Sequence, residues 1–332
     1  GLGENMKEAM ALMENVINHA KADREAYDRF VSTTLKSRKD NKLDQKTNFQ
    51  ALQTYGMYGP YNAFRNVPSS TELEQKDPQQ LVDLIASLKN YKHCVIYYGP
   101  MELKQLIATI DKGHAVGKKL QDAPAAKYYT KEQTPQTEVL LAPYDAKNIY
   151  MMQYSNDGKK WNPAEQPVIT VFNEYFGGGM NGVVFQELRE SRGLAYSAYA
   201  DYSTPNRQRD TDYAMTYIIS QNDKMSDCIR VFNDIIDTLP QSEQAFELAK
   251  QATSKRIASE RITKTGIIFS YLSNMERGIN YDIRRNIYDA LPNLTLKDVV
   301  NFEKNNFAGK TWRYIILGDE KNLDMKALEK LG

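Results

Sequence analysis

The feature that most constrains this chain is a succession of predicted elements that occurs twice. The first succession contains three helices, a loop, a helix that begins at Asp77, a strand at Cys94–Tyr98, a glycine and a short helix. The second contains three helices, a loop, a helix that begins at Thr295, a strand at Trp312–Leu317, a glycine and a short helix. The two successions align when the second is shifted by roughly 220 residues, which indicates a duplicated structural unit.

Only the second copy has a front half, which runs from about Val139 to Gln221. We therefore predict that residues 1–118 form the C-terminal half of one repeat and residues 139–332 a complete repeat. Residues 119–138 are predicted to be a linker, because Lys, Gln, Ala, Pro and Thr dominate there and the apolar period disappears. Half of a sandwich of sheet and helices exposes a sheet edge and an apolar face. We therefore expect a missing N-terminal segment, or a second copy of the chain in a homodimer, to cover them.

Periodicity indicates an α+β protein. Lys147–Ser155, Tyr196–Tyr202 and Thr211–Ser220 alternate as strands do, whereas Pro163–Phe176 and Asn181–Arg192 follow a helical pattern. Among the helix starts, Asp77 suits the N-cap and Pro78 suits the first helical position, where its missing N–H costs nothing. We expect each repeat to be an antiparallel sheet covered on one face by helices.

Composition excludes several classes of function. The chain has 43 basic and 42 acidic residues, so its formal charge of +1 does not favour nucleic acid or an anionic membrane surface. No apolar run approaches the roughly 20 residues that span a bilayer. Because its first residues run directly into a helical pattern, we expect that no signal peptide opens the chain and that a preceding segment has been removed. Cys94 and Cys228 are far apart in sequence, which allows one disulfide but favours two buried thiols.

A glycine-rich turn and the helix after it carry a family resemblance. Phe172–Met180 reads FNEYFGGGM, and Val184–Ser197 reads VFQELRESRGLAYS. This closely resembles the repeats of pitrilysin, insulin-degrading enzyme and the mitochondrial processing peptidases, and Leu239–Phe246 and Leu294–Val299 look like helix starts of that family. The resemblance covers nearly the whole chain. It implies a metallohydrolase-type sandwich and membership of the pitrilysin/insulinase family of zinc metallopeptidases.

The zinc motif of that family is absent. The resemblance implies an active site built from two halves, of which one supplies an inverted His-x-x-Glu-His zinc site. The histidines here are His19, His93 and His114, and none begins or ends such a pattern. We expect each of them to be a surface or packing residue, although a site assembled from all three is left open. The chain is therefore predicted to lack a metal and a cofactor of its own, with zinc in a missing catalytic half.

The resemblance also implies a substrate-contacting pair, an Arg and a Tyr seven positions apart, which match Arg189 and Tyr196. A guanidinium can anchor a peptide carbonyl, and a phenol can donate a hydrogen bond to the developing oxyanion. On spacing alone, an Arg paired with Glu187 or Glu190 and a half-buried Tyr explain the same residues. Arg192 is better explained as a positive charge in the last turn of a helix.

Gly177, Gly178 and Gly179 do not form a phosphate-binding loop, because no Lys-Ser/Thr follows and no strand immediately precedes them. We expect them to permit a tight turn between helices with positive φ. Five tyrosines follow at positions 196, 199, 202, 213 and 217. Packing of these rings between sheet and helices is one interpretation. A groove for extended peptide beside an exposed edge strand is the other.

Together these features predict the non-catalytic half of a zinc metalloendopeptidase, inactive alone, which closes a chamber and binds extended peptide for a zinc-bearing domain or subunit of the same family. Two other classes stay open: a structural assembly subunit, and a peptide-binding module without a catalytic partner. Bacterial relatives of this tandem type favour the periplasm, whereas low cysteine use fits the cytoplasm.

Overall fold

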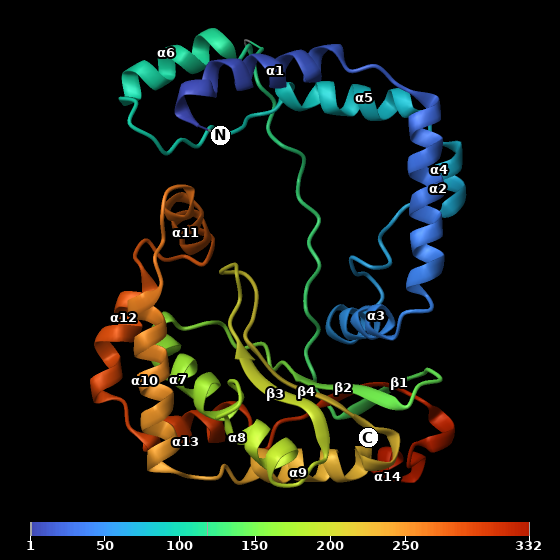
Figure 1. Cartoon of the computed structure of the whole chain (residues 1–332), viewed down its shortest axis with the longest axis vertical. Coiled ribbons are helices and arrows are strands. Elements are labelled where there is room, and N and C mark those ends of the chain that lie inside the picture. Colours follow the sequence, from blue (N-terminus) through green and yellow to red (C-terminus); the bar gives the residue numbers. More distant parts are fainter. Residues whose placement is uncertain (1, 118, 332) are drawn as a thin grey trace. The chain divides into compact units, whose positions relative to one another are not determined.

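The chain, described by a computed structural model over residues 2–117 and 119–331, divides into two compact units. The helical unit comprises Gly1–Asn41, Val67–Tyr128 and Thr263–Phe269. The sheet unit comprises Lys42–Asn66, Tyr129–Ile262 and Ser270–Gly332, and it contains most of the contacts within the chain. Both units are drawn in Figure 1.

The helical unit contains few buried side chains. Its main helices are α1 (Met6–His19), α2 (Arg24–Asn41), α4 (Ser70–Gln75), α5 (Pro78–Ser87) and α6 (Leu103–Gly113), with short 3-10 turns at Gly3–Asn5 and Leu88–Asn90. As predicted, the Asp77 side chain caps α5 by accepting a hydrogen bond from a backbone N–H, and Pro78 is its first residue. Tyr27, Val31 and Leu73 form a small core, where the Tyr27 hydroxyl donates to the Leu73 carbonyl oxygen at 2.7 Å.

The strand predicted at Cys94–Tyr98 is not formed. The segment has no regular structure, and the nearest β-bridge is an isolated one between Tyr91 and Gln121. Val95 and Ile96 are 53% and 49% exposed. A strand needs a neighbour that accepts and donates its ladder hydrogen bonds, and no segment among the described residues lies alongside to do so.

The sheet unit is built on five strands in the order β1-β5-β2-β4-β3. They are β1 (Glu138–Pro143), β2 (Asn148–Ser155), β3 (Ala195–Ser203), β4 (Tyr213–Gln221) and β5 (Arg313–Gly318). The α+β class is confirmed, but the expectation of a wholly antiparallel sheet is wrong. β1 pairs with β5 in parallel, while the other three pairs are antiparallel.

Helices cover one face of this sheet. They are α7 (Gln166–Phe176), α8 (Val183–Phe185), α9 (Met225–Asp237), α10 (Glu243–Ser259), α12 (Ile283–Ala290) and α13 (Leu296–Asn306), with 3-10 turns at Pro163–Glu165, Asn222–Lys224 and Leu291–Asn293. α14 (Met325–Glu329) follows a turn at Glu320–Asn322, and α11 (Thr265–Glu276) has residues in both units. The large core lies between this layer and the sheet, where Phe172, Phe176 and Phe232 are fully buried.

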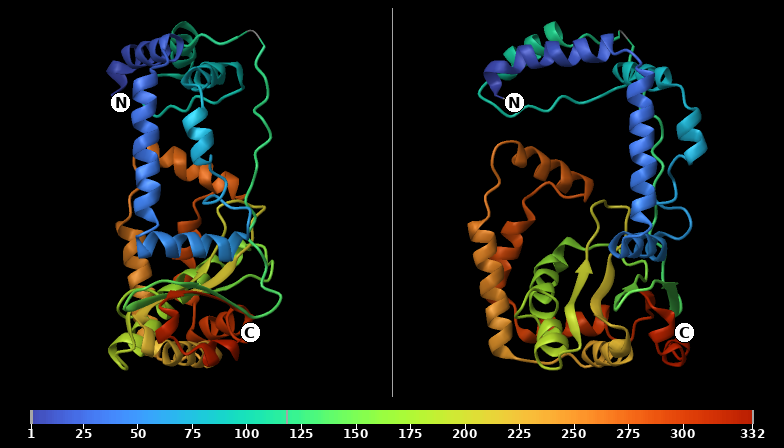
Figure 2. Two further views of the ribbon diagram at one scale, coloured as in Figure 1. Left: turned by 90° about the vertical axis from the view of Figure 1, so that its right-hand side faces the viewer. Right: turned by 45° about the vertical axis from the view of Figure 1, so that its right-hand side comes forward.

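A further helix, α3 (Gln45–Tyr58), packs on the opposite face of the sheet (Figures 1 and 2). Phe49 is only 2% exposed and packs with Ile315 of β5. Gly56 allows the close approach, since a Cβ there would lie 2.4 Å from the Ile315 side chain. The Arg313 guanidinium donates to the Gly56 carbonyl oxygen and pairs with Glu132 at 3.1 Å. The prediction that helices cover one face of the sheet is therefore incomplete, because α3 also covers part of the second face.

Two further predictions concern the whole chain. In residues 2–117 and 119–331, no helix combines the length and the hydropathy that a membrane span requires. Both cysteines are free thiols: Cys228 is buried as predicted, whereas Cys94 is exposed, contrary to the prediction. Burial raises the pKa of the Cys228 thiol.

Candidate functional site

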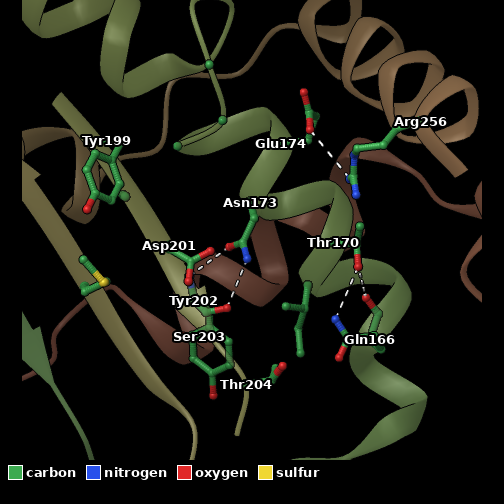
Figure 3. A pocket seen from close by; sticks show the side chains of 16 residues that line it. Gln166, Thr170, Asn173, Glu174, Tyr199, Asp201, Tyr202, Ser203, Thr204 and Arg256 are labelled. Atoms are coloured by element: carbon green, nitrogen blue, oxygen red, sulfur yellow. Dashed lines mark hydrogen bonds and ion pairs between the residues drawn. The ribbon is translucent and has the colours of Figure 1, made fainter. Parts of the chain in front are cut away.

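A groove of about 660 Å³ lies between α7 and β3 in the sheet unit. One wall is α7 with the glycine turn that ends it, and the other is β3 (Figure 3). Both walls carry polar side chains, including Gln166, Thr170, Asn173, Asp201 and Ser203. Such a surface can form hydrogen bonds with the main chain of an extended peptide.

Asn173 of α7 occupies part of the outer edge of β3. Its side-chain amide donates to the Tyr202 carbonyl oxygen at 3.0 Å, and its Oδ1 accepts from the Tyr202 N–H at 2.9 Å (Figure 3). Because outward-facing backbone groups recur at every second residue of an edge strand, those of Ala198 and Ala200 face the same way as those of Tyr202.

Gly177 covers the next outward position. A Cβ at Gly177 would lie 1.7 Å from the Ala200 carbonyl oxygen, so only glycine allows this backbone contact. The peptide-groove interpretation supposed that the edge of β3 is open along its whole length. The structure shows that part of this edge is covered. At Ala200 and Tyr202 the end of α7 already occupies it, and a peptide in the groove must rely on side chains there.

The three glycines differ in what they require. The prediction of positive φ holds for Gly179, at +62°, with open space around its Cβ position. Gly177 and Gly178 have ordinary backbone angles, and instead a Cβ on either would collide with neighbouring backbone atoms. Crowding against β3 and the end of α7, as well as turn geometry, explains the glycine run.

Charges of both signs lie in the groove. Burial raises the pKa of the Asp201 carboxyl, which a hydrogen bond with Ser203 opposes. Across the groove, Glu174 of α7 and Arg256 of α10 form an ion pair at 3.8 Å. The groove thus contains an anionic and a cationic side chain that pair with each other.

Arg189 and Tyr196 lie outside the set of residues that line this groove. Arg189 sits on the π-helical turn Gln186–Glu190, with its guanidinium 4.8 Å from the centre of the Phe185 ring. It also pairs with Glu190 at 3.9 Å, as one of the two interpretations expected. Arg192 instead pairs with Glu187 at 3.0 Å.

Tyr196 stands near the start of β3 and is 57% exposed. Its hydroxyl accepts a hydrogen bond of 3.4 Å from the Gln221 amide at the end of β4. The alternative interpretation expects a half-buried Tyr, and an exposure of 57% does not contradict it. Both Arg189 and Tyr196 are accessible to a ligand, and their contact with substrate stays a prediction.

The five tyrosines do not form one surface. Tyr199 stacks on Tyr217 with ring centres 4.9 Å apart, whereas Tyr202 is buried and meets Phe302 at 5.0 Å. Alternation along β3 sends residues 199 and 202 to opposite faces. Sequence reasoning missed Asn173, Asp201 and the Glu174–Arg256 pair, because single polar residues in a helix or strand have no motif of their own.

Two of the three histidines, which were predicted to be surface or packing residues, lie next to each other. In the helical unit, the Nε2 atoms of His93 and His114 are 2.9 Å apart, whereas the Nδ1 of His19 lies 3.0 Å from the Asn15 carbonyl oxygen. In the part of the chain that the structure describes, no three His, Cys, Asp or Glu side chains gather around a common point. These residues therefore do not fit the zinc site of a metallopeptidase.

Comparison with known families decides the relationship. The profile of the peptidase M16 inactive domain matches residues 77–253, more than half of the chain. This chain belongs to the peptidase M16 inactive-domain family. The matched residues include the glycine turn, both walls of the groove, Arg189 and Tyr196. No curated protein matches this M16 chain.

Solved structures share its fold. The M16 inactive domain from Pseudomonas fluorescens aligns with a TM-score of 0.67 and 14% identity, over 96% of this chain and 76% of that one. A protease from Helicobacter pylori aligns with a TM-score of 0.65 and 11% identity, over 96% and 78%. The periplasmic protease PqqL from Escherichia coli aligns with a TM-score of 0.68 and 14% identity, over 96% of this M16 chain but only 35% of its own length.

Proposed function

We propose that this chain is the non-catalytic half of a zinc metalloendopeptidase, which helps to close a chamber and holds extended peptide for a zinc-bearing half supplied elsewhere. The observation that carries the proposal is the combination of an M16 inactive domain with a polar groove beside an edge strand. The zinc motif is missing from the sequence, so hydrolysis requires a second domain or subunit.

The order of elements supports the proposal that residues 1–118 form the C-terminal half of a repeat. α2, α3 and α5 begin 219, 220 and 218 residues before α10, α11 and α13. The unpaired segment Cys94–Tyr98 begins 219 residues before β5. In this proposal the segment becomes a strand when the missing front half of its repeat pairs with it.

Arg189 and Tyr196 are proposed as the residues that contact substrate. Both side chains are accessible, on the turn before β3 and at its start. A peptide that passes these two residues and continues into the groove would follow β3 for roughly 20 Å, at about 3.3 Å per residue. The groove would then hold peptide side chains, while Asn173 and Gly177 prevent pairing with the last part of the strand.

The deciding experiment combines this chain with a zinc-bearing M16 domain or subunit and follows cleavage of a quenched fluorescent peptide. We expect cleavage only when both are present, loss of activity with a chelator, and recovery with Zn²⁺. Chelator-sensitive cleavage by this chain alone would refute the proposal. A stable complex that neither binds nor cleaves peptide would instead identify a structural assembly subunit.

The periplasm is part of this proposal. It is supported by the fold shared with a periplasmic protease of Escherichia coli. Fractionation of the native host with an antibody to this chain tests it, and recovery of the chain with cytoplasmic markers would contradict it.

A further inference from the structure

Two histidines from distant parts of the helical unit meet with their Nε2 atoms 2.9 Å apart. His93 lies in the extended segment after α5, and His114 follows the last residue of α6. Their ring planes are 76° apart and the ring centres are separated by 5.0 Å. The pair is unrelated to the groove and to the proposed substrate contacts, which all lie in the sheet unit.

The other nitrogen of each ring is held by an oxygen. The Nδ1 of His114 contacts the carboxylate of Glu14 on α1, and both of these side chains are only 16% exposed. The Nδ1 of His93 lies 2.8 Å from the Tyr91 carbonyl oxygen. An ionised carboxylate and a backbone carbonyl can only accept hydrogen bonds, so both Nδ1 atoms carry the proton.

This assignment leaves a lone pair on each Nε2. Two lone pairs that face each other at 2.9 Å repel, unless a positively charged species lies between them. A metal-binding histidine has this arrangement: one ring nitrogen binds the metal, and the other donates to a carboxylate or a backbone carbonyl that fixes the tautomer. Here both histidines have such a partner.

We propose that His93 and His114 bind a divalent first-row metal ion of the kind that prefers imidazole, Zn²⁺ or Ni²⁺, through their two Nε2 atoms. At bond lengths of about 2.0–2.1 Å, nitrogens 2.9 Å apart subtend about 90° at the ion, the cis angle of six-coordinate geometry. Tetrahedral zinc requires about 3.3 Å between them, which a small rotation of the exposed His93 ring supplies. Water completes the site, because no third His, Cys, Asp or Glu of the described residues joins it.

The ion would join three segments that little else holds together. α1 has no buried residue, and among the described residues of this unit the core cluster consists of Tyr27, Val31 and Leu73. One ion would connect the end of α6 to the extended segment, and Glu14 would couple both to α1. An ion that binds the folded chain and not the unfolded chain would raise the free energy of unfolding in proportion to the logarithm of the metal concentration.

The chain provides a matched control, because it has only three histidines. We would titrate the untagged, chelator-treated chain with Ni²⁺ and with Zn²⁺ by calorimetry, and use Mg²⁺ as the ion that imidazole does not favour. We expect one ion per chain in the wild type and in His19→Ala, and none in His93→Ala or His114→Ala. Glu14→Gln should bind about 10–100-fold more weakly. Equal binding by His93→Ala, or no binding by the wild type, would overturn the proposal and leave the pair sharing a proton.

A second measurement on the wild type does not depend on how the variants fold. Long-range ¹H–¹⁵N spectra resolve the ring nitrogens of the three histidines, and added Zn²⁺ should shift the Nε2 signals of His93 and His114 only. Their Nδ1 signals should remain those of a protonated nitrogen. Shifts confined to His19, or equal in all three rings, would contradict the assignment.

Discussion

The side-chain amide of Asn173 forms with Tyr202 the two hydrogen bonds that a neighbouring strand would form, at 3.0 and 2.9 Å. A residue of a helix thereby takes the place of a sixth strand at this point of the sheet edge. Exposed edges invite pairing with other chains, and covering them is one way in which proteins prevent it. The contact also fixes α7 relative to β3, and so sets the width of the groove.

We expect Asn173→Ala to lower the free energy of unfolding by about 1–3 kcal/mol, because the N–H and carbonyl of Tyr202 lose their partners. Asn173→Asp should also destabilise, since an ionised carboxylate accepts from the N–H but repels the carbonyl oxygen. That loss should shrink in acid, where a protonated Asp can donate again. Urea denaturation measures both effects, with the exposed Asn181→Ala as the control. Unchanged stability in Asn173→Ala would show that water replaces the amide.

The glycine turn gives a second prediction, in which two neighbouring substitutions differ in cause. Gly177→Ala places a methyl group 1.7 Å from the Ala200 carbonyl oxygen, so α7 must move away from β3. We expect a loss of about 1–3 kcal/mol in the free energy of unfolding. Gly179→Ala meets no atom, but strains a backbone at φ +62° by about 1–2 kcal/mol.

Gly179→Asn separates the two causes, because Asn tolerates positive φ and should recover part of the loss. Gly177→Asn should recover nothing, since the obstacle there is space. Chemical denaturation of the four variants measures this. The steric explanation fails if Gly177→Ala proves as stable as the wild type.

Local pattern predicted β2, β3, β4 and β5, but it did not predict β1, and it predicted a strand at Cys94–Tyr98 where no partner lies alongside. Cys94–Tyr98 and β5 both show a short apolar run followed by glycine, yet every residue of β5 is buried and the earlier segment has no strand. The difference lies in neighbouring strands, which no local pattern reports. For the same reason β1 and its parallel pairing were missed, because Glu138 and its partner Arg313 are 175 residues apart.

The candidate site shows the same division. The FNEYFGGGM run marks the place, since the glycine turn borders the groove. It does not reveal that Asn173 pairs with Tyr202, because that contact joins residues 29 positions apart on a helix and a strand. Likewise, His93 and His114 are separated by 21 positions, and only the fold of the helical unit brings them together.

We expect Arg189→Ala and Tyr196→Phe to lower peptide turnover in the reconstituted enzyme while they leave the fold unchanged. Each side chain is accessible and contributes little to packing, so the free energy of unfolding should change by less than about 0.5 kcal/mol. Removal of one hydrogen bond to a developing oxyanion typically lowers kcat by about 10²–10³-fold, which bounds the effect of Tyr196→Phe. Arg192→Ala is the control, since its partner is Glu187. Wild-type turnover in both variants would remove the pair from the site.

Glu303 of α13 gives a prediction about pH. It is 1% exposed, one of its carboxylate oxygens has no hydrogen-bond partner, and burial raises its pKa from 4.5 to about 7. Lys304 opposes this shift and Asp237 adds to it. Because the folded chain binds the proton more tightly than the unfolded chain, stability is lost as pH rises from 4.5 to about 7.

Glu303→Gln removes the ionisable group and should therefore be more stable than the wild type at pH 8, by on the order of 2–3 kcal/mol. Near pH 4.5 the Glu303 carboxyl of the folded wild type is protonated and therefore neutral, as is the amide that replaces it in the variant. The stability advantage of Glu303→Gln should therefore disappear there. Urea denaturation of both proteins at pH 5 and pH 8 measures the change, with the exposed Glu329→Gln as the control. A difference between Glu303→Gln and the wild type that is the same at both pH values would mean that Glu303 stays ionised in the folded chain, with water or a cation reaching its carboxylate.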